Sequence, residues 1–295
     1  MFVADRYSPG QQALRERVRQ GDITVGLVFP SEFNRQLSQG KPAEIQVLVD
    51  GGDANTAEIA SGYLTQIVPQ FNRQLSDRAV LPLMDPQITF LYNPGLISSC
   101  FFVPAMMDVV LMLIGSLVSS AALIREKDTG TLEQLLMTPA SAAEILLAKV
   151  VPLFALLLGD ALLALGVAHA VFGVPLRGSF LLFLGLSGLY VFVGIGIGML
   201  LAPLCQNQQQ VMLTSFFINM PLIQLSGAIT PIESMPAFFR YLSLLNPLRH
   251  DVAIQRAVLL RGVGLEVIWP NAIALLVFAT VLGAISANQF RHQVS

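Results

Sequence analysis

The sequence predicts an all-α polytopic membrane domain of five transmembrane helices, which follows a small N-terminal α/β domain. Hydrophobic residues make up 54% of the chain and charged residues 12%, whereas soluble proteins contain roughly 25% charged residues. A bilayer core about 30 Å thick is crossed by roughly 20 helical residues, and five apolar stretches reach this length. They are residues 96–124, 145–172, 180–204, 211–232 and 267–290, of which the last three contain no charged residue.

Residues 1–95 have the composition of a separate domain. They hold ten of the nineteen acidic residues and eight of the seventeen basic residues. Three β-rich runs alternate with helical patterns. The runs are residues 23–29, 44–49 and 87–92. No His, Cys or Lys lies near the Gly51-Gly52-Asp53 turn, so a plain turn is favoured over an anion or metal site.

Charge and motif content argue against several function classes. The formal net charge is −2, which gives no reason to expect nucleic acid as a partner. No His-Glu-x-x-His or Cys-x-x-Cys spacing indicates a metal site. Cys100 and Cys205 fall near span ends on opposite sides of the membrane, so no disulfide is expected.

The chain also lacks a phosphate-binding loop. Such a loop needs a lysine followed by Ser or Thr, but Lys41, Lys127 and Lys149 are followed by Pro, Asp and Val. Any energy source must therefore lie on another polypeptide, and this chain is expected to bind no cofactor and no metal.

A short polar segment, residues 125–140, separates the first two predicted spans. Thr131 and Gln134 have the spacing of a helix capping box, and Pro139 ends the helix that begins there. Three leucines fall on one face of this helix. They are Leu132, Leu135 and Leu136. The segment is therefore predicted to be a short amphipathic helix, although amphipathicity alone is equally compatible with a helix resting on lipid headgroups.

Three blocks along the chain carry a family resemblance. The blocks are Ile45-Gln46-Val47-Leu48-Val49-Asp50-Gly51, then Arg125-Glu126-Lys127-x-x-Gly130-Thr131-Leu132-Glu133-Gln134-Leu135-Leu136-x-Thr138-Pro139, and last Leu225-Ser226-Gly227 with Pro231-Ile232-Glu233-Ser234-Met235-Pro236 and Asn246-Pro247. Together they closely resemble type-2 ABC transporter permeases, the drug-efflux branch in particular.

In that family the polar segment is a cytoplasmic coupling helix that docks on an ATP-hydrolysing subunit. The resemblance implies that the leucine face fills a groove on the ATPase and that Arg125, Glu126 and Glu133 set registry through charge pairs. ATP and Mg would be bound by the partner subunit. The full set of coupling residues implied is Arg125, Glu126, Gly130, Thr131, Leu132, Glu133, Leu135, Leu136 and Pro139.

The resemblance also implies how the chain is oriented in the membrane. The distribution of basic residues does not decide this orientation, because with five spans four basic residues fall on one side of the membrane and five on the other. The resemblance places residues 1–95 in the periplasm and the C-terminus inside a bacterial inner membrane. The implied partners are the cytoplasmic ABC ATPase, a second copy or a sister permease, the bilayer, and optionally a periplasmic adaptor.

The chain departs from the family pattern at its beginning. The family has six membrane helices, the first of which precedes the external domain, whereas Met1 already lies inside what resembles that domain. The sequence alone therefore suggests a truncated or mis-started permease, or one half of a split permease, whose independent activity would be doubtful.

Two carboxylates fall within predicted spans, where a charge costs at least about 2.5 kcal/mol. Asp108 and Asp160 are therefore candidates for a wet substrate path or a proton relay. The structural alternatives are a headgroup position for Asp108 and a hydroxyl partner on a neighbouring helix for Asp160.

Residues 233–265 are too polar to span but carry many apolar side chains. This pattern predicts one or two short helices in the outer leaflet, broken at Asn246-Pro247. By resemblance the loop would close the outer end of the path, while a passive loop resting on lipid is the alternative. The candidate gate residues are Glu233, Pro236, Asn246, Pro247 and Arg256.

An intramembrane serine protease is a rival suggested by Gly185-Leu186-Ser187-Gly188. That chemistry needs a histidine on a later membrane helix, but His250 and His292 fall in a loop and in the tail. Small residues here, with Gly194-x-x-x-Gly198, are better explained by close helix packing.

The most consistent interpretation is the permease subunit of an ATP-driven exporter of a hydrophobic or amphiphilic compound, with no enzymatic activity of its own. A non-transporting membrane scaffold or sensor is the alternative from another class, together with an inactive permease fragment.

Overall fold

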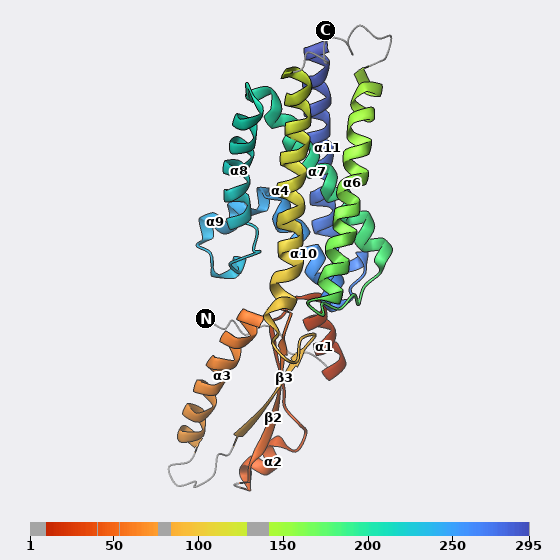
Figure 1. Ribbon diagram of the computed structural model, residues 1–295. Coiled ribbons are helices and arrows are strands. Elements are labelled where there is room, and N and C mark those ends of the chain that lie inside the picture. The colour runs from red at the N-terminus through yellow and green to blue at the C-terminus, as the bar shows by residue number, and fades with distance from the viewer. Residues whose placement is uncertain (1–9, 40, 53, 76–83, 129–141, 295) are drawn as a thin grey trace. The chain divides into compact units, whose positions relative to one another are not determined.

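The computed structural model describes residues 10–39, 41–52, 54–75, 84–128 and 142–294. The chain divides into two compact units, Met1–Phe101 and Phe102–Ser295. The first unit contains the strands, and the second is helical (Figure 1).

The first unit is built on a three-stranded sheet in the order β1-β2-β3. Strand β2 (Ala43–Asp50) lies in the middle, antiparallel to β1 (Val25–Val28) and parallel to β3 (Met84–Leu91). Alternate residues of β2 face the same side of the sheet. On that side Ile45, Val47 and Val49 pack against Ala57 and Ala60.

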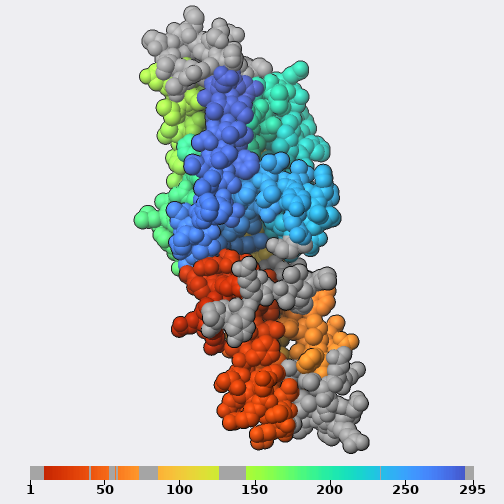
Figure 2. Space-filling view, turned by 180° about the vertical axis from the view of Figure 1, so that it is seen from behind, coloured from red at the N-terminus to blue at the C-terminus, as the bar shows by residue number. Residues whose placement is uncertain are grey.

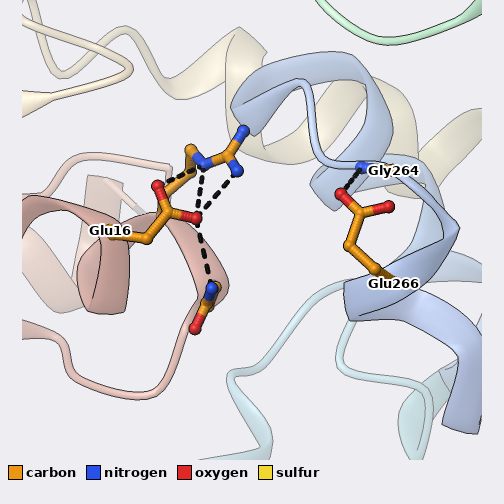
Figure 3. A network of polar contacts seen from close by, with 5 residues as sticks. Glu16, Gly264 and Glu266 are labelled. Atoms are coloured by element: carbon orange, nitrogen blue, oxygen red, sulfur yellow. Dashed lines mark hydrogen bonds and ion pairs between the residues drawn. The ribbon is translucent and has the colours of Figure 1, made fainter. Parts of the chain in front are cut away.

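Three helices accompany this sheet. They are α1 (Gln11–Gln20), α2 (Phe33–Ser38) and α3 (Ala54–Leu75), the last of which links the parallel strands β2 and β3. Helix α1 ends at Gly21, whose φ of 80° is left-handed and suits glycine. Within α1, Glu16 accepts hydrogen bonds from Arg19 and Gln20 (Figure 3).

The second unit contains five long helices that run alongside one another (Figure 1). They are α4 (Ser98–Asp128), α6 (Ala142–Ala170), α7 (Phe180–Leu201), α8 (Gln208–Gln224) and α11 (Leu265–Val294). Helix α7 packs against α6, α8 and α11, and half or more of its residues are buried. By contrast α11 presents an exposed face (Figure 2), with Trp269, Ile273 and Leu276 each at least half exposed.

Four of the described helices are long and apolar enough to cross a membrane. Their apolar stretches are Ser98–Arg125, Glu144–Ala170, Phe180–Leu204 and Leu265–Gln289. They correspond to four of the five predicted spans.

The remaining predicted span, residues 211–232, is wrong in its extent. Helix α8 has 17 residues and ends at Gln224, so at about 1.5 Å per residue it is shorter than a bilayer core of about 30 Å. The chain turns there because the Ser226 hydroxyl donates to the Ile223 carbonyl and accepts from the Ala228 amide. Gly227 takes a φ of 82° in this turn. The predicted span extended beyond this turn because residues 225–232 are also mostly uncharged and apolar, so the hydropathy of the sequence does not mark the end of the helix.

The segment after α8 forms several short helices. It contains η2 (Ile232–Ser234), α9 (Ala237–Leu242), η3 (Ser243–Leu245), α10 (Pro247–Arg256) and the π-helix η4 (Ala257–Arg261). The predicted break at Asn246-Pro247 is confirmed. Helix α9 exposes Phe238 and Tyr241, whereas α10 is largely buried against α7 and α11. Gly264 continues the chain into α11, its amide donating to Glu266 (Figure 3).

The loop between α6 and α7 is fastened to η4. The Arg177 amide donates to the Leu259 carbonyl at 3.1 Å, and the Arg177 guanidinium donates to the Leu260 carbonyl at 2.8 Å. Gly178 lies so close to Val258 that an added Cβ would be 2.6 Å from the Val258 carbonyl oxygen. Two carbonyls of the π-helical turn thus accept hydrogen bonds from Arg177, which lies in a loop distant in the sequence.

Glycines bring α4 and α7 into close contact, as the Gly194-x-x-x-Gly198 spacing predicts. A Cβ built on Gly115 would lie 3.6 Å from the Gly194 Cα. A Cβ on Gly198 would overlap the Ser116 carbonyl oxygen and the Ser119 hydroxyl. Only a residue without a side chain therefore permits this helix separation.

Gly198→Ala is expected to lower the free energy of unfolding by about 1–3 kcal/mol, because the new methyl group must push the α4 backbone away. The measurement is the thermal unfolding midpoint of the purified protein in detergent. Gly185→Ala is the matched control on the same helix, since nothing lies within 4 Å of its Cβ. Equal losses of stability in the two variants would contradict the close contact.

Candidate functional site

The predicted coupling segment lies mostly outside the described residues. Arg125 is exposed near the end of α4, and Glu126 belongs to the same helix. The residues outside the described part are Gly130, Thr131, Leu132, Glu133, Leu135, Leu136 and Pro139. Figure 1 shows that the end of α4, the start of α6 and the end of α11 lie at the same end of the second unit.

The most unusual polar group in the described helices is a pair of buried carboxyls. Asp108 of α4 is 2% exposed and Asp251 of α10 is 0% exposed. The two carboxyl groups lie close enough to act electrostatically on each other. Burial raises the pKa of Asp251, which lies outside the four candidate spans, to about 8. Asp108 is therefore buried among the helices of this unit, and its neighbour is an acid. The alternative of a headgroup-level position for Asp108 stays a prediction.

Polar residues of α7 and α10 surround this pair. The Tyr190 hydroxyl donates to the Asp108 backbone carbonyl at 3.1 Å. One helical turn after Asp251, Gln255 donates from its amide to the Ser187 hydroxyl at 3.0 Å. Three helices, α4, α7 and α10, thus contribute to one buried polar cluster, defined by Asp108, Ser187, Tyr190, Asp251 and Gln255.

Sequence reasoning missed Asp251 and Gln255. A detectable signal was the Asn246-Pro247 pair, which is a strong helix start. A helix from Pro247 places Leu248, Asp251 and Gln255 along one side at spacings of three and four. Nothing in the sequence alone pairs that side with Asp108, which is more than a hundred residues away.

The other membrane carboxylate predicted, Asp160, lies on α6 and is half-buried. It is not among the groups that act electrostatically on Asp108. The two candidate path residues therefore belong to different environments, and their proposed role in a substrate path stays a prediction.

A second polar contact joins α4 to α8. The Asn219 amide donates to the Ser116 hydroxyl at 2.8 Å and to the Ser215 carbonyl at 2.7 Å. The hydroxyls of Ser120 and Ser215 lie 3.3 Å apart. All four side chains are buried. Their spacings of four residues on each helix were visible in the sequence, but the pairing between helices was not.

The predicted gate residues occupy structural positions at the helix ends. Asn246 caps α10 by accepting from the Leu248 amide at 3.1 Å, and its own amide donates to the Leu222 carbonyl of α8 at 2.6 Å. Pro247 is the first residue of α10, Pro236 precedes α9, and Glu233 lies in η2.

Arg256, the last of the predicted gate residues, ends α10. Its guanidinium donates to the carbonyls of Gly227 and Ala228 at 3.1 and 3.3 Å. These carbonyls belong to the turn that ends α8, so Arg256 fastens this turn to α10.

The residues of the protease-like motif, Gly185 to Gly188, do not form a catalytic arrangement with His250. The Ser187 hydroxyl accepts from Gln255. The ring nitrogens of His250 face the Asn271 side-chain oxygen at 2.9 Å and the Leu244 carbonyl at 3.0 Å. A serine nucleophile needs a histidine within hydrogen-bond reach, and neither residue has that contact.

Comparison with known proteins assigns the family. The profile described as "ABC-2 family transporter protein" matches residues 5–288. This chain belongs to the ABC-2 family. The family predicted from three sequence blocks is thereby confirmed, and with four candidate spans among its described helices the chain is a multi-pass membrane protein.

Several relatives from Escherichia coli (strain K12) match over most of the chain. The probable multidrug ABC transporter permease YbhR is 32% identical over 284 residues, which cover 96% of this chain and 77% of YbhR. The probable multidrug ABC transporter permease YbhS is 32% identical over 268 residues, covering 88% and 71%. The inner membrane transport permease YhhJ is 31% identical over 301 residues, covering 100% and 78%.

Asn246→Ala is expected to lower the thermal unfolding midpoint more than Asn207→Ala. Both changes remove an N-cap, worth about 0.5–2 kcal/mol, because Asn207 accepts from the Gln210 amide at 2.8 Å. Only Asn246→Ala also removes the donor of the partly buried Leu222 carbonyl, at a further cost of about 0.5–1.5 kcal/mol. Equal midpoints for the two purified variants would show that the bond between α8 and α10 contributes nothing.

Proposed function

We propose that this chain is the membrane-spanning permease subunit of an ATP-binding-cassette exporter, which couples ATP hydrolysis on a separate subunit to the efflux of a hydrophobic or amphiphilic compound. The match of the ABC-2 family to residues 5–288 carries the proposal. The names of two relatives, which call them probable multidrug ABC transporter permeases, support the class of activity.

Coupling to the ATPase would run through residues 125–140. Leu132, Leu135 and Leu136 would fill an apolar groove on the ATPase, while charges such as Arg125 and Glu133 set its registry. ATP and Mg²⁺ would be held by that partner subunit. The capping-box spacing and the leucine pattern of the segment support this role.

The orientation follows from the same assignment. The coupling segment would lie in the cytoplasm of a bacterium, the chain in the inner membrane, and residues 1–95 in the periplasm. In this arrangement α8 is a fifth, short span, so that an odd number of crossings separates the N-terminal unit from the C-terminus. A short apolar helix is accommodated by local thinning of the bilayer or by burial against other helices.

Transport would take place between two permease subunits, either two copies of this chain or this chain and a sister permease. Closure of two ATP-bound partner subunits would push the coupling helices, tilt the spans and open a path between the permeases. Residues 233–265 would close the outer end of that path. The tight connection of α8 to α10 through Asn246 and Arg256 supports a concerted movement of this outer segment.

Leu136→Ala and Glu133→Lys are each expected to reduce the stimulation of the ATPase by the permease at least tenfold. The first change removes an apolar anchor from the docking surface, and the second reverses a charge there. The assay uses proteoliposomes that contain the permease and a cognate ABC ATPase.

The matched control is Leu163→Ala on α6, a leucine that is 66% exposed on an apolar span and is expected to face lipid. All three variants should insert into membranes at the wild-type level. Unchanged ATPase stimulation and efflux in the Leu136 and Glu133 variants would count against the coupling role.

A further inference from the structure

The Asp108–Asp251 contact is chemically incomplete if both groups are ionised. Asp108 Oδ2 and both carboxyl oxygens of Asp251 are buried, and none has a donor among the described residues. Two carboxylates offer only acceptors to each other. The contact becomes a hydrogen bond when one of them carries a proton.

Most of the surrounding donors have other hydrogen-bond partners, and the Gln255 side chain also acts on Asp251, where it lowers the pKa of the carboxyl against the larger effect of burial. The Tyr190 hydroxyl on α7 donates to the Asp108 backbone carbonyl, and the Gln255 amide donates to Ser187. Arg256 lies close enough to act electrostatically on Asp108, and its guanidinium donates to Gly227 and Ala228. His250, on the same helix as Asp251, faces Asn271 and Leu244. Among the residues that the structure describes, no group of three or more His, Cys, Asp or Glu could hold a metal ion.

We propose that Asp108 and Asp251 form a proton-binding site, in which the two carboxyl groups share one proton and so join α4 to α10. The proton is the ligand that fits, because both side chains are almost completely shielded from solvent. Two like charges in contact in a buried site repel strongly, so one of the pair remains neutral. This inference goes beyond the proposed function and does not depend on it, because proton binding can be measured on the chain without a transport assay.

Loss of the shared proton would weaken the attachment of α10. With both acids ionised, repulsion acts between α4 and α10 in surroundings where the effective dielectric is low. The turn at the end of α8 is fastened to α10 through Arg256, and Asn246 joins the same two helices. A change in protonation would therefore reach the segment from α8 to α10.

The sign of the pH dependence follows from linkage. The folded protein keeps the proton in a range where an unfolded aspartate, with a pKa of about 3.9, has lost it. Burial raises the pKa of Asp251 to about 8. The contribution of the pair to stability should therefore fall as pH rises above about 4 and continue to fall through about 8, since the pair still holds one proton after Asp251 ionises.

The direct test is infrared spectroscopy of the full chain in lipid nanodiscs across this pH range. A protonated-carboxyl band should be present in the wild type near pH 6, decrease as Asp251 ionises through about 8, and persist above that as the one proton that the pair shares. Asp108→Asn and Asp251→Asn should each remove it, because the new amide donates to the remaining carboxylate. Asp160→Asn, a matched change in another span, should retain it.

Thermal unfolding gives a second readout. Relative to the wild type, Asp108→Asn and Asp251→Asn should become more stable as pH rises from about 5 to about 8, while Asp160→Asn should follow the wild-type profile. Three results would each overturn the proposal: no band in the wild type near pH 6, a band that persists in both single variants, or stabilisation that depends on Na⁺ concentration at constant pH.

Discussion

The close contact of α4 and α7 at Gly115, Gly194 and Gly198 is the constraint on which the second unit depends. Without side chains at these positions the two backbones approach one another, and the Tyr190 hydroxyl reaches the Asp108 carbonyl. Helix α7 is also the helix against which α10 packs. The glycines therefore hold α4 and α7 at the separation at which the Tyr190 hydroxyl contacts Asp108, and the polar cluster depends on helix packing through small residues.

Polar and apolar side chains are distributed unevenly over the helices of the second unit. Buried Ser, Asn and Asp side chains concentrate on α4, α7, α8 and α10. Exposed apolar residues are numerous on α6 and α11, such as Leu163 and Val277, and also on one face of α8, such as Phe217. A helix covered with exposed leucine and valine suits contact with lipid, whereas buried hydroxyls and amides need partners inside the protein. The sorting separates a lipid-facing side of the described helices from a polar interior.

The sequence allowed prediction of the features that depend on many residues at once. Spans were recognised because hydropathy is summed over about 20 residues, and the family because three blocks occur in order. The end of α8 was mistaken, since the turn at Ser226 and Gly227 depends on two local hydrogen bonds within an apolar run. Asp108 was recognised as a carboxylate within an apolar span, but its neighbour Asp251 was not identified, because the two residues lie on helices far apart in the sequence. The coupling residues from Gly130 to Pro139 stay predictions.

The attachment of Arg177 to η4 limits how this unit can change shape. Two hydrogen bonds and the close fit of Gly178 against Val258 tie the entry of α7 to the turn that leads into α11. These helices also pack along their length. Rotation of α7 relative to α11 at that end would leave carbonyls of the π-helical turn unpaired. The two helices are therefore best regarded as a single rigid block, and any hinge has to lie outside it.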